Sequence, residues 1–290
     1  MRTEKEVFDL ILDFARNDSR IRAVGMEGSR ANANVPKDIF QDYDISYFVT
    51  DKESFLSNEH WIDIFGERII MQTPEIMSLF PPSLGNWFSY LMLFTDGNRI
   101  DLKLIPVNET DLYVKSDKLI KILLDKDGLF PVLPRPSDED YHIKPPTREY
   151  FSDCCNEFWW VSTYVAKGLW RKEILYANAH INDYVRPSLL RMLGWKAGIL
   201  TEYKKSVGKD YKYLPQFITK NEWELLLSTY KNSNYEDCWT SLFTMTYLFR
   251  ETALFVAERL GYIYPEQDDK RVTKYLKQVN KLPDDTNTIF

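Results

Sequence analysis

The stretch Phe40-Gln41-Asp42-Tyr43-Asp44-Ile45-Ser46-Tyr47-Phe48-Val49 decides the fold of this chain. Residues i and i+2 of a β-strand project from the same face, roughly 7 Å apart. Asp42, Asp44 and Ser46 therefore share one face. The opposite face carries apolar side chains: Tyr43, Ile45, Tyr47 and Val49. The pattern predicts a strand over residues 42–50 that buries one face and presents two carboxylates on the other.

A second stretch repeats this division of polar and apolar faces. Residues 87–94 and 99–107 read as a hairpin around Thr95-Asp96-Gly97-Asn98, a sequence typical of tight turns. In the second arm Asp101 and Lys103 lie opposite the aliphatic residues Ile100, Leu102 and Leu104. Two such strands can share a sheet whose apolar side is covered by helices. We therefore expect all three aspartates to face one cleft.

Capping residues and the spacing of apolar residues predict the other helices and strands of the first half. Thr3 and Glu6 form a capping-box pattern ahead of an amphipathic stretch, which predicts a helix over 3–16. A strand over 21–27 is expected to end at Gly28-Ser29, where a polar loop begins. Further along we expect a helix and two strands, over residues 52–65, 68–72 and 119–124.

The second half is helical by pattern. Prolines concentrated between residues 131 and 146 break regular structure, and we place a domain boundary there. The apolar repeats that follow predict four helices, over residues 148–170, 172–199, 221–230 and 235–260. The segment after Gly261 is polar and is expected to be loosely held. The predicted fold class is α+β, with an N-terminal mixed-sheet domain (residues 1–146) followed by a C-terminal α-helical bundle domain (residues 147–290).

Composition limits the classes of partner. The net charge of −6 opposes a long contact with a phosphate backbone, so we expect no nucleic acid partner. The three cysteines show neither a disulfide framework nor zinc-ligand spacing. The N-terminus lacks an apolar signal core, and no run approaches the ~20 apolar residues of a membrane span. We expect a cytoplasmic protein without membrane contact, acting as a monomer.

The Gly-Ser pair and the three aspartates of the first half are the kinds of residue that nucleotidyl transfer requires. An isolated Asp-x-Asp is usually a pair of surface carboxylates, but here Gly28-Ser29 precedes Asp42 and Asp44, and Asp101 follows on a later strand. A glycine lets the backbone approach a polyphosphate, a serine can bind it, and carboxylates hold Mg²⁺. Asp101 has two open roles, as a metal ligand or as the base that takes the acceptor proton.

Two cationic residues near these positions have competing interpretations. Arg30 follows the Gly-Ser pair and reads equally well as a phosphate ligand or as a solvated loop arginine. Lys103 is interpreted as a charge partner only.

The helix expected over 148–170 carries a stripe of polar and aromatic residues at steps of three and four: Asp153, Glu157, Trp160, Tyr164, Lys167 and Arg171. Such a stripe is usually just the solvated side of a helix. This one mixes acids, rings and a lysine, which suits a cationic sugar-like acceptor and, for Lys167, a triphosphate. His60, His142 and His180 lack metal-ligand spacing and are read as structural or exposed. Cys154 and Cys155 are read as packing residues.

The order Gly-Ser, Asp-x-Asp and a later Asp resembles the polymerase-beta-like nucleotidyltransferases. Longer blocks resemble one of their families, the aminoglycoside 6-adenylyltransferases: Glu27-Gly-Ser-Arg, the run from Phe40 to Asp51, Leu84-Gly-Asn-Trp-Phe-Ser-Tyr, Leu123-Leu-Asp-Lys-Asp and Asp153-Cys-Cys-Asn-Glu-Phe-Trp. The similarity runs from the first residues to about residue 264, leaving the polar C-terminal segment unmatched.

The resemblance implies Mg²⁺-dependent transfer of AMP from ATP to the 6-hydroxyl of streptomycin, with release of pyrophosphate and resistance to the antibiotic. It implies that Gly28 and Ser29 hold the triphosphate, that Asp42 and Asp44 bind metal, and that Asp101 is the third carboxylate. The resemblance gives weaker support for acceptor contacts from the stripe, at Asp153, Glu157, Trp160 and Tyr164. Two alternatives stay open, namely transfer to an RNA end or a protein, and a nucleotide-binding module without turnover.

Overall fold

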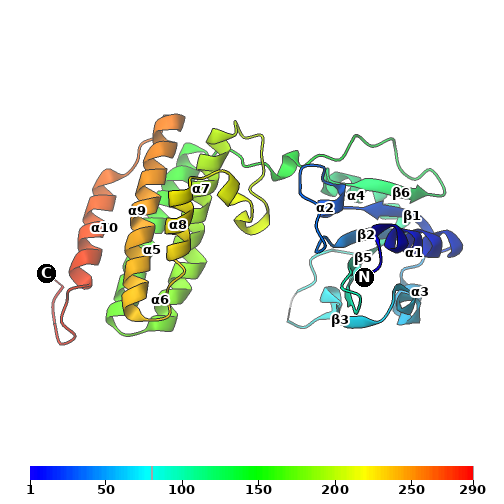
Figure 1. Cartoon of the computed structure of the whole chain (residues 1–290), viewed down its shortest axis with the longest axis horizontal. Coiled ribbons are helices and arrows are strands. Elements are labelled where there is room, and N and C mark those ends of the chain that lie inside the picture. Colours follow the sequence, from blue (N-terminus) through cyan, green and yellow to red (C-terminus); the bar gives the residue numbers. More distant parts are fainter. Residues whose placement is uncertain (80, 290) are drawn as a thin grey trace. The chain divides into compact units, whose positions relative to one another are not determined.

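A computed structural model describes residues 1–79 and 81–289 (Figure 1). The chain divides into two compact units, Met1–Asp140 and Tyr141–Phe290, and the division falls within the proline-rich stretch. The first unit is built on one β-sheet and the second on helices, so the expected α+β class is confirmed.

The first unit contains a six-stranded mixed sheet in the order β3-β4-β5-β2-β1-β6. Neighbouring strands are antiparallel except β2 and β5, which run parallel. The strands are β1 Ile21–Met26, β2 Tyr43–Val49, β3 Arg68–Gln72, β4 Phe88–Phe94, β5 Arg99–Pro106 and β6 Lys121–Asp125. Each strand predicted from the sequence is present, with ends shifted by a few residues.

Helix α1 (Glu4–Asn17) covers one face of this sheet. Its N-terminus is fixed by the predicted capping box, in which the Thr3 side chain accepts from the Glu6 amide while the Glu6 side chain accepts from the Thr3 amide. The core beneath it contains the apolar residues predicted for that face of β2. The Tyr47 hydroxyl donates to the Ile11 carbonyl at 2.7 Å, which ties β2 to the helix.

The opposite face of the sheet is only partly polar. Phe48 of β2 and Ile105 of β5 lie on the same face as Asp44 and Asp101, and both are fully buried. They pack with Tyr113 of α4 (Thr110–Ser116), whose ring lies 4.9 Å from that of Phe48. The carboxylates therefore occupy the N-terminal ends of β2 and β5, and a second small core occupies the other half.

Two predicted segments differ locally from expectation. The helix expected over 52–65 is split into α3 (Glu53–Leu56) and the 3₁₀ helix η1 (Glu59–Phe65), because the Asn58 side chain accepts from the His60 amide and starts a new turn. The loop after Gly28 begins with a one-turn helix, α2 (Gly28–Ala31). Short 3₁₀ turns complete the unit: η2 Pro74–Ile76, η3 Val107–Glu109 and η4 Glu139–Tyr141.

The second unit is a bundle of helices around one apolar core. Its elements are α5 Arg148–Trp170, α6 Ile174–His180, the π-helical turn η5 Ile181–Val185, α7 Arg186–Leu200, η6 Lys209–Tyr211, η7 Leu214–Gln216, α8 Lys220–Ser228, α9 Tyr235–Leu260 and α10 Glu266–Val279. The single helix expected over 172–199 is thus three consecutive segments. The buried thiols of Cys154 and Cys155 confirm the packing interpretation, and burial raises the pKa of Cys154 to about 11.

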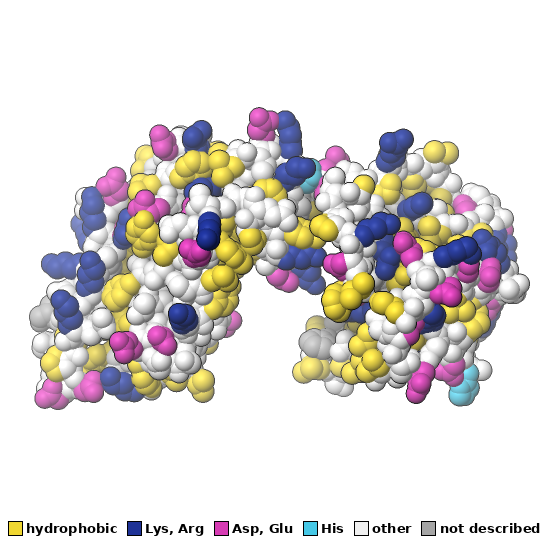
Figure 2. Space-filling view, viewed as in Figure 1, with side chains coloured by type: hydrophobic (Ala, Val, Ile, Leu, Met, Phe, Trp, Pro, Cys, Tyr) yellow, Lys and Arg dark blue, Asp and Glu magenta, His cyan; other side chains and the backbone are white. Residues whose placement is uncertain are grey.

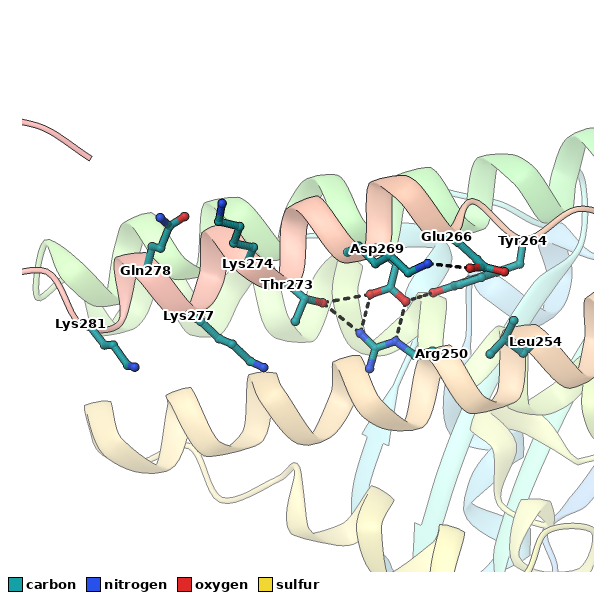
Figure 3. Close-up of a pocket in the computed structure, with 11 residues that line it drawn as sticks. Arg250, Leu254, Tyr264, Glu266, Asp269, Thr273, Lys274, Lys277, Gln278 and Lys281 are labelled. Atoms are coloured by element: carbon teal, nitrogen blue, oxygen red, sulfur yellow. Dashed lines mark hydrogen bonds and ion pairs between the residues drawn. The ribbon is translucent and has the colours of Figure 1, made fainter. Parts of the chain in front are cut away.

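The expectation of a loosely held C-terminal segment is wrong. Residues 266–279 form α10, which packs against α5 and buries Leu276 and Val279. Asp269, 3% exposed, accepts hydrogen bonds from Arg250, Tyr264 and Thr273, so the helix is also anchored to α9 by a buried ion pair (Figure 3). High polarity concealed an amphipathic repeat, and Figure 2 shows lysine and arginine side chains gathered over the outer side of α10.

Within the described ranges, the helices are too short or too polar to cross a membrane.

Candidate active site

The parallel pairing of β2 and β5 brings the predicted carboxylates together. Asp44 and Asp101 are register partners on the two strands, and Asp42 lies directly before β2. The guanidinium of Arg99 joins the group. It donates to Asp101 Oδ1 at 2.8 Å and Oδ2 at 2.7 Å, and its Nη1 lies 3.7 Å from Asp42 Oδ2. The three acids thus lie in the same region of the sheet, with Arg99 between Asp42 and Asp101.

Burial and the crowding of negative charge both raise the pKa of Asp44. Burial, followed by the nearby charges of Asp101, Glu27 and Asp42, raises the pKa of this carboxyl to about 7, against the lowering effect of Lys103. A divalent cation beside Asp44 would offset this repulsion.

Gly28 lies against the same carboxylate. Its φ is +67°, in the left-handed region that favours glycine, and a Cβ built on it would lie 2.2 Å from Asp44 Oδ2. The adjacent Glu27 amide donates to the Asp44 carbonyl at 2.9 Å. Ser29 follows in α2, so the chain that carries the Gly-Ser pair is held directly beside the acids.

The guanidinium of Arg30 is held by backbone carbonyls and an aromatic ring, whereas a phosphate ligand needs its donors directed toward the phosphate. Its guanidinium donates to the carbonyls of Asp42 at 3.0 Å and Gln41 at 2.8 Å, and it lies over the Tyr43 ring at 3.7 Å from the centroid. The side chain is 10% exposed. These contacts fix the segment entering β2, and the phosphate role of Arg30 stays a prediction.

A buried polar group beneath the carboxylates was not assigned a role from the sequence. Glu27 accepts hydrogen bonds from the Ser46 hydroxyl and the Lys103 ammonium group. The predicted role of Lys103 as a charge partner is therefore confirmed, with Glu27 as the acid. One signal in the sequence was available: a lysine on the inward polar face of a strand requires a nearby acid.

The chemistry of these side chains fits magnesium, because Mg²⁺ prefers carboxylate oxygens and tolerates few protein ligands. Across residues 1–79 and 81–289, no three His, Cys, Asp or Glu side chains are grouped tightly enough to hold an ion. The positive charge beside Asp42 and Asp101 comes from Arg99.

The stripe predicted on the C-terminal unit forms one side of α5. Trp160 Nε1 donates to the Tyr164 hydroxyl at 2.9 Å, and Lys167 Nζ lies 4.7 Å from the Tyr164 ring centroid. Glu157 and Asp153 are exposed one and two turns, respectively, before Trp160. The rings of His180 and Tyr164 meet edge to face, and His60 is an exposed residue near Asp63, as expected of structural or exposed histidines.

Comparison with known proteins identifies the family. The model of the streptomycin adenylyltransferase family matches residues 1–279, which extends the expected similarity through α10. The aminoglycoside 6-adenylyltransferase of Bacillus subtilis (strain 168) is 54% identical over 280 residues, covering 96% of this chain and 98% of that protein. Proteins of the same name from Campylobacter jejuni and Staphylococcus aureus are 51% and 42% identical and cover 97% and 96% of this chain, and 97% and 98% of their own lengths.

A solved structure is also similar. The crystal structure of an aminoglycoside 6-adenyltransferase from Bacillus subtilis is 50% identical, covers 97% of this chain and 100% of its own, and superposes with a TM-score of 0.49. With a near full-length family match and relatives above 50% identity, this chain belongs to the streptomycin adenylyltransferase family.

Proposed function

We propose that this protein transfers AMP from ATP to the 6-hydroxyl of an aminoglycoside, with streptomycin as the acceptor and pyrophosphate as the second product. The observation that carries the proposal is the register pairing of Asp44 with Asp101, together with Gly28 packed against Asp44. The names of the relatives support the class of acceptor.

Asp42, Asp44 and Asp101 would hold Mg²⁺ in this proposal. The ion, when bound, neutralises charge on the phosphorus under attack and on the departing pyrophosphate. Gly28 has no side chain, so the triphosphate can approach the backbone and the Ser29 hydroxyl beside the acids.

The acceptor hydroxyl must lose a proton as its oxygen attacks the α-phosphorus. Asp101 is the candidate to take it, and the alternative role as a further metal ligand stays open. In either role the bidentate pair with Arg99 would orient the Asp101 carboxylate.

The acceptor would be held by the stripe on α5. Asp153 and Glu157 supply negative charge, and Trp160 and Tyr164 supply ring faces, a combination that attracts an organic cation. Contact of Lys167 with the triphosphate stays a prediction. Activity in the cytoplasm as a monomer is likewise proposed.

The direct test is to incubate the protein with ATP, Mg²⁺ and streptomycin and to follow both products by mass spectrometry and a pyrophosphate assay. AMP-streptomycin and pyrophosphate should form in equal amounts, and Asp44→Asn should form neither. Asp111→Asn, an exposed aspartate in the first turn of α4, is the matched control and should retain wild-type turnover. Absence of both products with wild-type protein would refute the proposal.

A further inference from the structure

An aromatic patch extends the stripe of α5 onto the neighbouring helical segments. We define it by five side chains: Trp160 and Tyr164 from α5, Tyr176 and His180 from α6, and Tyr184 from the π-helical turn. Their rings form a connected series. Centroid separations are 6.0 Å from Trp160 to Tyr164, 5.6 Å from Tyr164 to His180, 4.2 Å from His180 to Tyr176 and 5.7 Å from His180 to Tyr184.

Much of this patch is open to solvent. Trp160 is 58% exposed, Tyr184 46% and Tyr176 36%, although the core of the same unit buries large aromatics such as Trp159 almost completely. Exposed rings gathered from several elements mark binding surfaces more often than scattered single ones do.

The two chain segments run antiparallel, which places acids beside the exposed rings. Cys154 contacts the Ser188 carbonyl and Tyr164 contacts His180, so Tyr184 lies level with the turn of α5 that carries Glu157 and Trp160. Glu157 makes no ion pair with any residue in the described ranges 1–79 and 81–289. Its charge is thus available at the edge of the aromatic patch.

Tyr184 lies on the π-helical turn. A π-turn contains more residues per turn than an α-helix and therefore rotates the side chains that follow it. The Tyr184 ring lies 5.7 Å from that of His180, four residues earlier, so the patch continues from α6 onto the π-helical turn.

The ring faces already contact one cation. Lys167 Nζ lies 4.7 Å from the centroid of Tyr164 and 5.8 Å from that of Tyr176. Aromatic faces carry negative potential and attract cations within about 6 Å. Lys167 lies toward one end of the patch, while Trp160, one turn after Glu157 on α5, and Tyr184 end the ring series away from it.

We propose that Trp160, Tyr184 and Glu157 form a subsite for a planar guanidinium group of the acceptor. A guanidinium stacks flat on aromatic rings and donates to a carboxylate at its edge, which a compact ammonium group cannot do in the same geometry. Tyr184 would then select acceptors by their guanidinium substituents. This inference rests on the proposed function, since it assigns a specificity determinant to the same acceptor.

Calorimetry with streptomycin in the absence of ATP tests the subsite separately from catalysis. Tyr184→Leu removes the ring and should weaken binding about three- to thirty-fold, the range for a cation–π contact. Tyr184→Phe retains the ring and should bind within about two-fold of wild type, since only the hydroxyl is lost. In turnover assays Tyr184→Leu should raise KM for streptomycin and leave KM for ATP unchanged.

Tyr247→Leu is the matched control, because Tyr247 is a tyrosine of the same helical unit with a similar exposure of 49%. Its streptomycin affinity should equal that of wild type. Streptidine, the bis-guanidinium cyclitol of streptomycin, should compete for the subsite, and 2-deoxystreptamine, which carries amines instead, should not.

The outcomes separate the two proposals. Equal streptomycin affinity for Tyr184→Leu and Tyr247→Leu, with unchanged melting temperatures, would overturn the subsite and leave the reaction standing. Wild-type protein that binds streptomycin through Tyr184 without forming AMP-streptomycin would overturn the reaction alone. Wild-type protein that neither binds streptomycin nor forms AMP-streptomycin would overturn both.

Discussion

Gly28 and Asp44 fit together so closely that a Cβ on the glycine would lie 2.2 Å from the carboxylate oxygen. Any side chain at position 28 must displace Asp44 or the backbone of the Gly-Ser segment. Since Asp44 is paired in register with Asp101, such a displacement would also change the spacing of the two acids.

Gly28→Ala is therefore expected to lower kcat/KM at least 100-fold, a loss of about 2.7 kcal/mol or more of transition-state stabilisation. The control is Gly97→Ala, because Gly97 also has a positive φ, of +84°, but nothing lies within 4 Å of its Cβ position. Both variants carry the conformational cost of a positive φ, and steady-state kinetics should show the activity loss only for Gly28→Ala. Equal activities would contradict the close-packing explanation.

Asp44→Asn should separate catalysis from stability. The variant loses a proposed metal ligand, so turnover should fall below detection. It also removes one charge from a crowded group of acids, so its melting temperature at pH 8 without Mg²⁺ should be equal to or higher than that of wild type. Differential scanning calorimetry checks the second point, and a marked destabilisation would show that Asp44 has a structural role instead.

The buried pair of Glu27 and Lys103 should contribute to folding. The side chains are 12% and 27% exposed, so Lys103→Met would leave a partly buried carboxylate unpaired and cost about 2 kcal/mol. Denaturant unfolding measures this cost. The control is Lys270→Met, which removes an exposed pair with Glu266 and should cost less than about 0.5 kcal/mol.

A double substitution tests the same pair further. Glu27→Gln combined with Lys103→Met removes both charges and should be less destabilising than Lys103→Met alone. Additive losses would show that the two side chains do not interact.

Attachment of α10 should depend on pH. Burial alone would raise the pKa of Asp269, but hydrogen bonds from Arg250, Tyr264 and Thr273 outweigh it and hold the pKa below its usual value. A lowered folded-state pKa contributes stability above the unfolded pKa of about 3.9, and this stability is lost as the pH falls through the folded value.

The protection factors of the α10 amides, which correct for the slower intrinsic exchange at acid pH, should therefore fall before those of the α5 amides as the pH is lowered. Asp269→Asn should produce the same effect at pH 7, because it leaves Arg250 without its partner. Asp268→Asn, at an exposed neighbouring position, is the control and should leave the exchange rates unchanged.

Most strands of the sheet could be predicted from the sequence because each is specified by signals within a few residues. The capping box of Thr3 and Glu6, the turn at Asp96-Gly97 and the alternation around Asp42 and Asp44 each specify an element over a few residues. The grouping of Asp101 with Asp44 also followed, since shared polar faces constrain how two strands pair.

Contacts between distant positions could not be predicted in this way. Nothing near Arg30 indicates that its guanidinium binds the carbonyls of Gln41 and Asp42, and nothing near Arg99 specifies its contact with Asp42. The helix α10 was missed for a different reason. Its charged residues dominate the composition, and one of them, Asp269, is buried through a pairing with Arg250 of α9 that local sequence does not indicate.

The shared face of β2 and β5 has a consequence for how this enzyme family can change. Asp44 is two positions from Ser46 and four from Phe48, which is locked against Tyr113 and Phe130. A substitution that shifts β2 or β5 would disturb both the small core around Phe48 and the positions of the carboxylates. We therefore expect few substitutions to be tolerated in these two strands. Adaptation to new antibiotics is therefore expected at exposed positions of the helical unit such as Tyr184, while β2 and β5 stay unchanged.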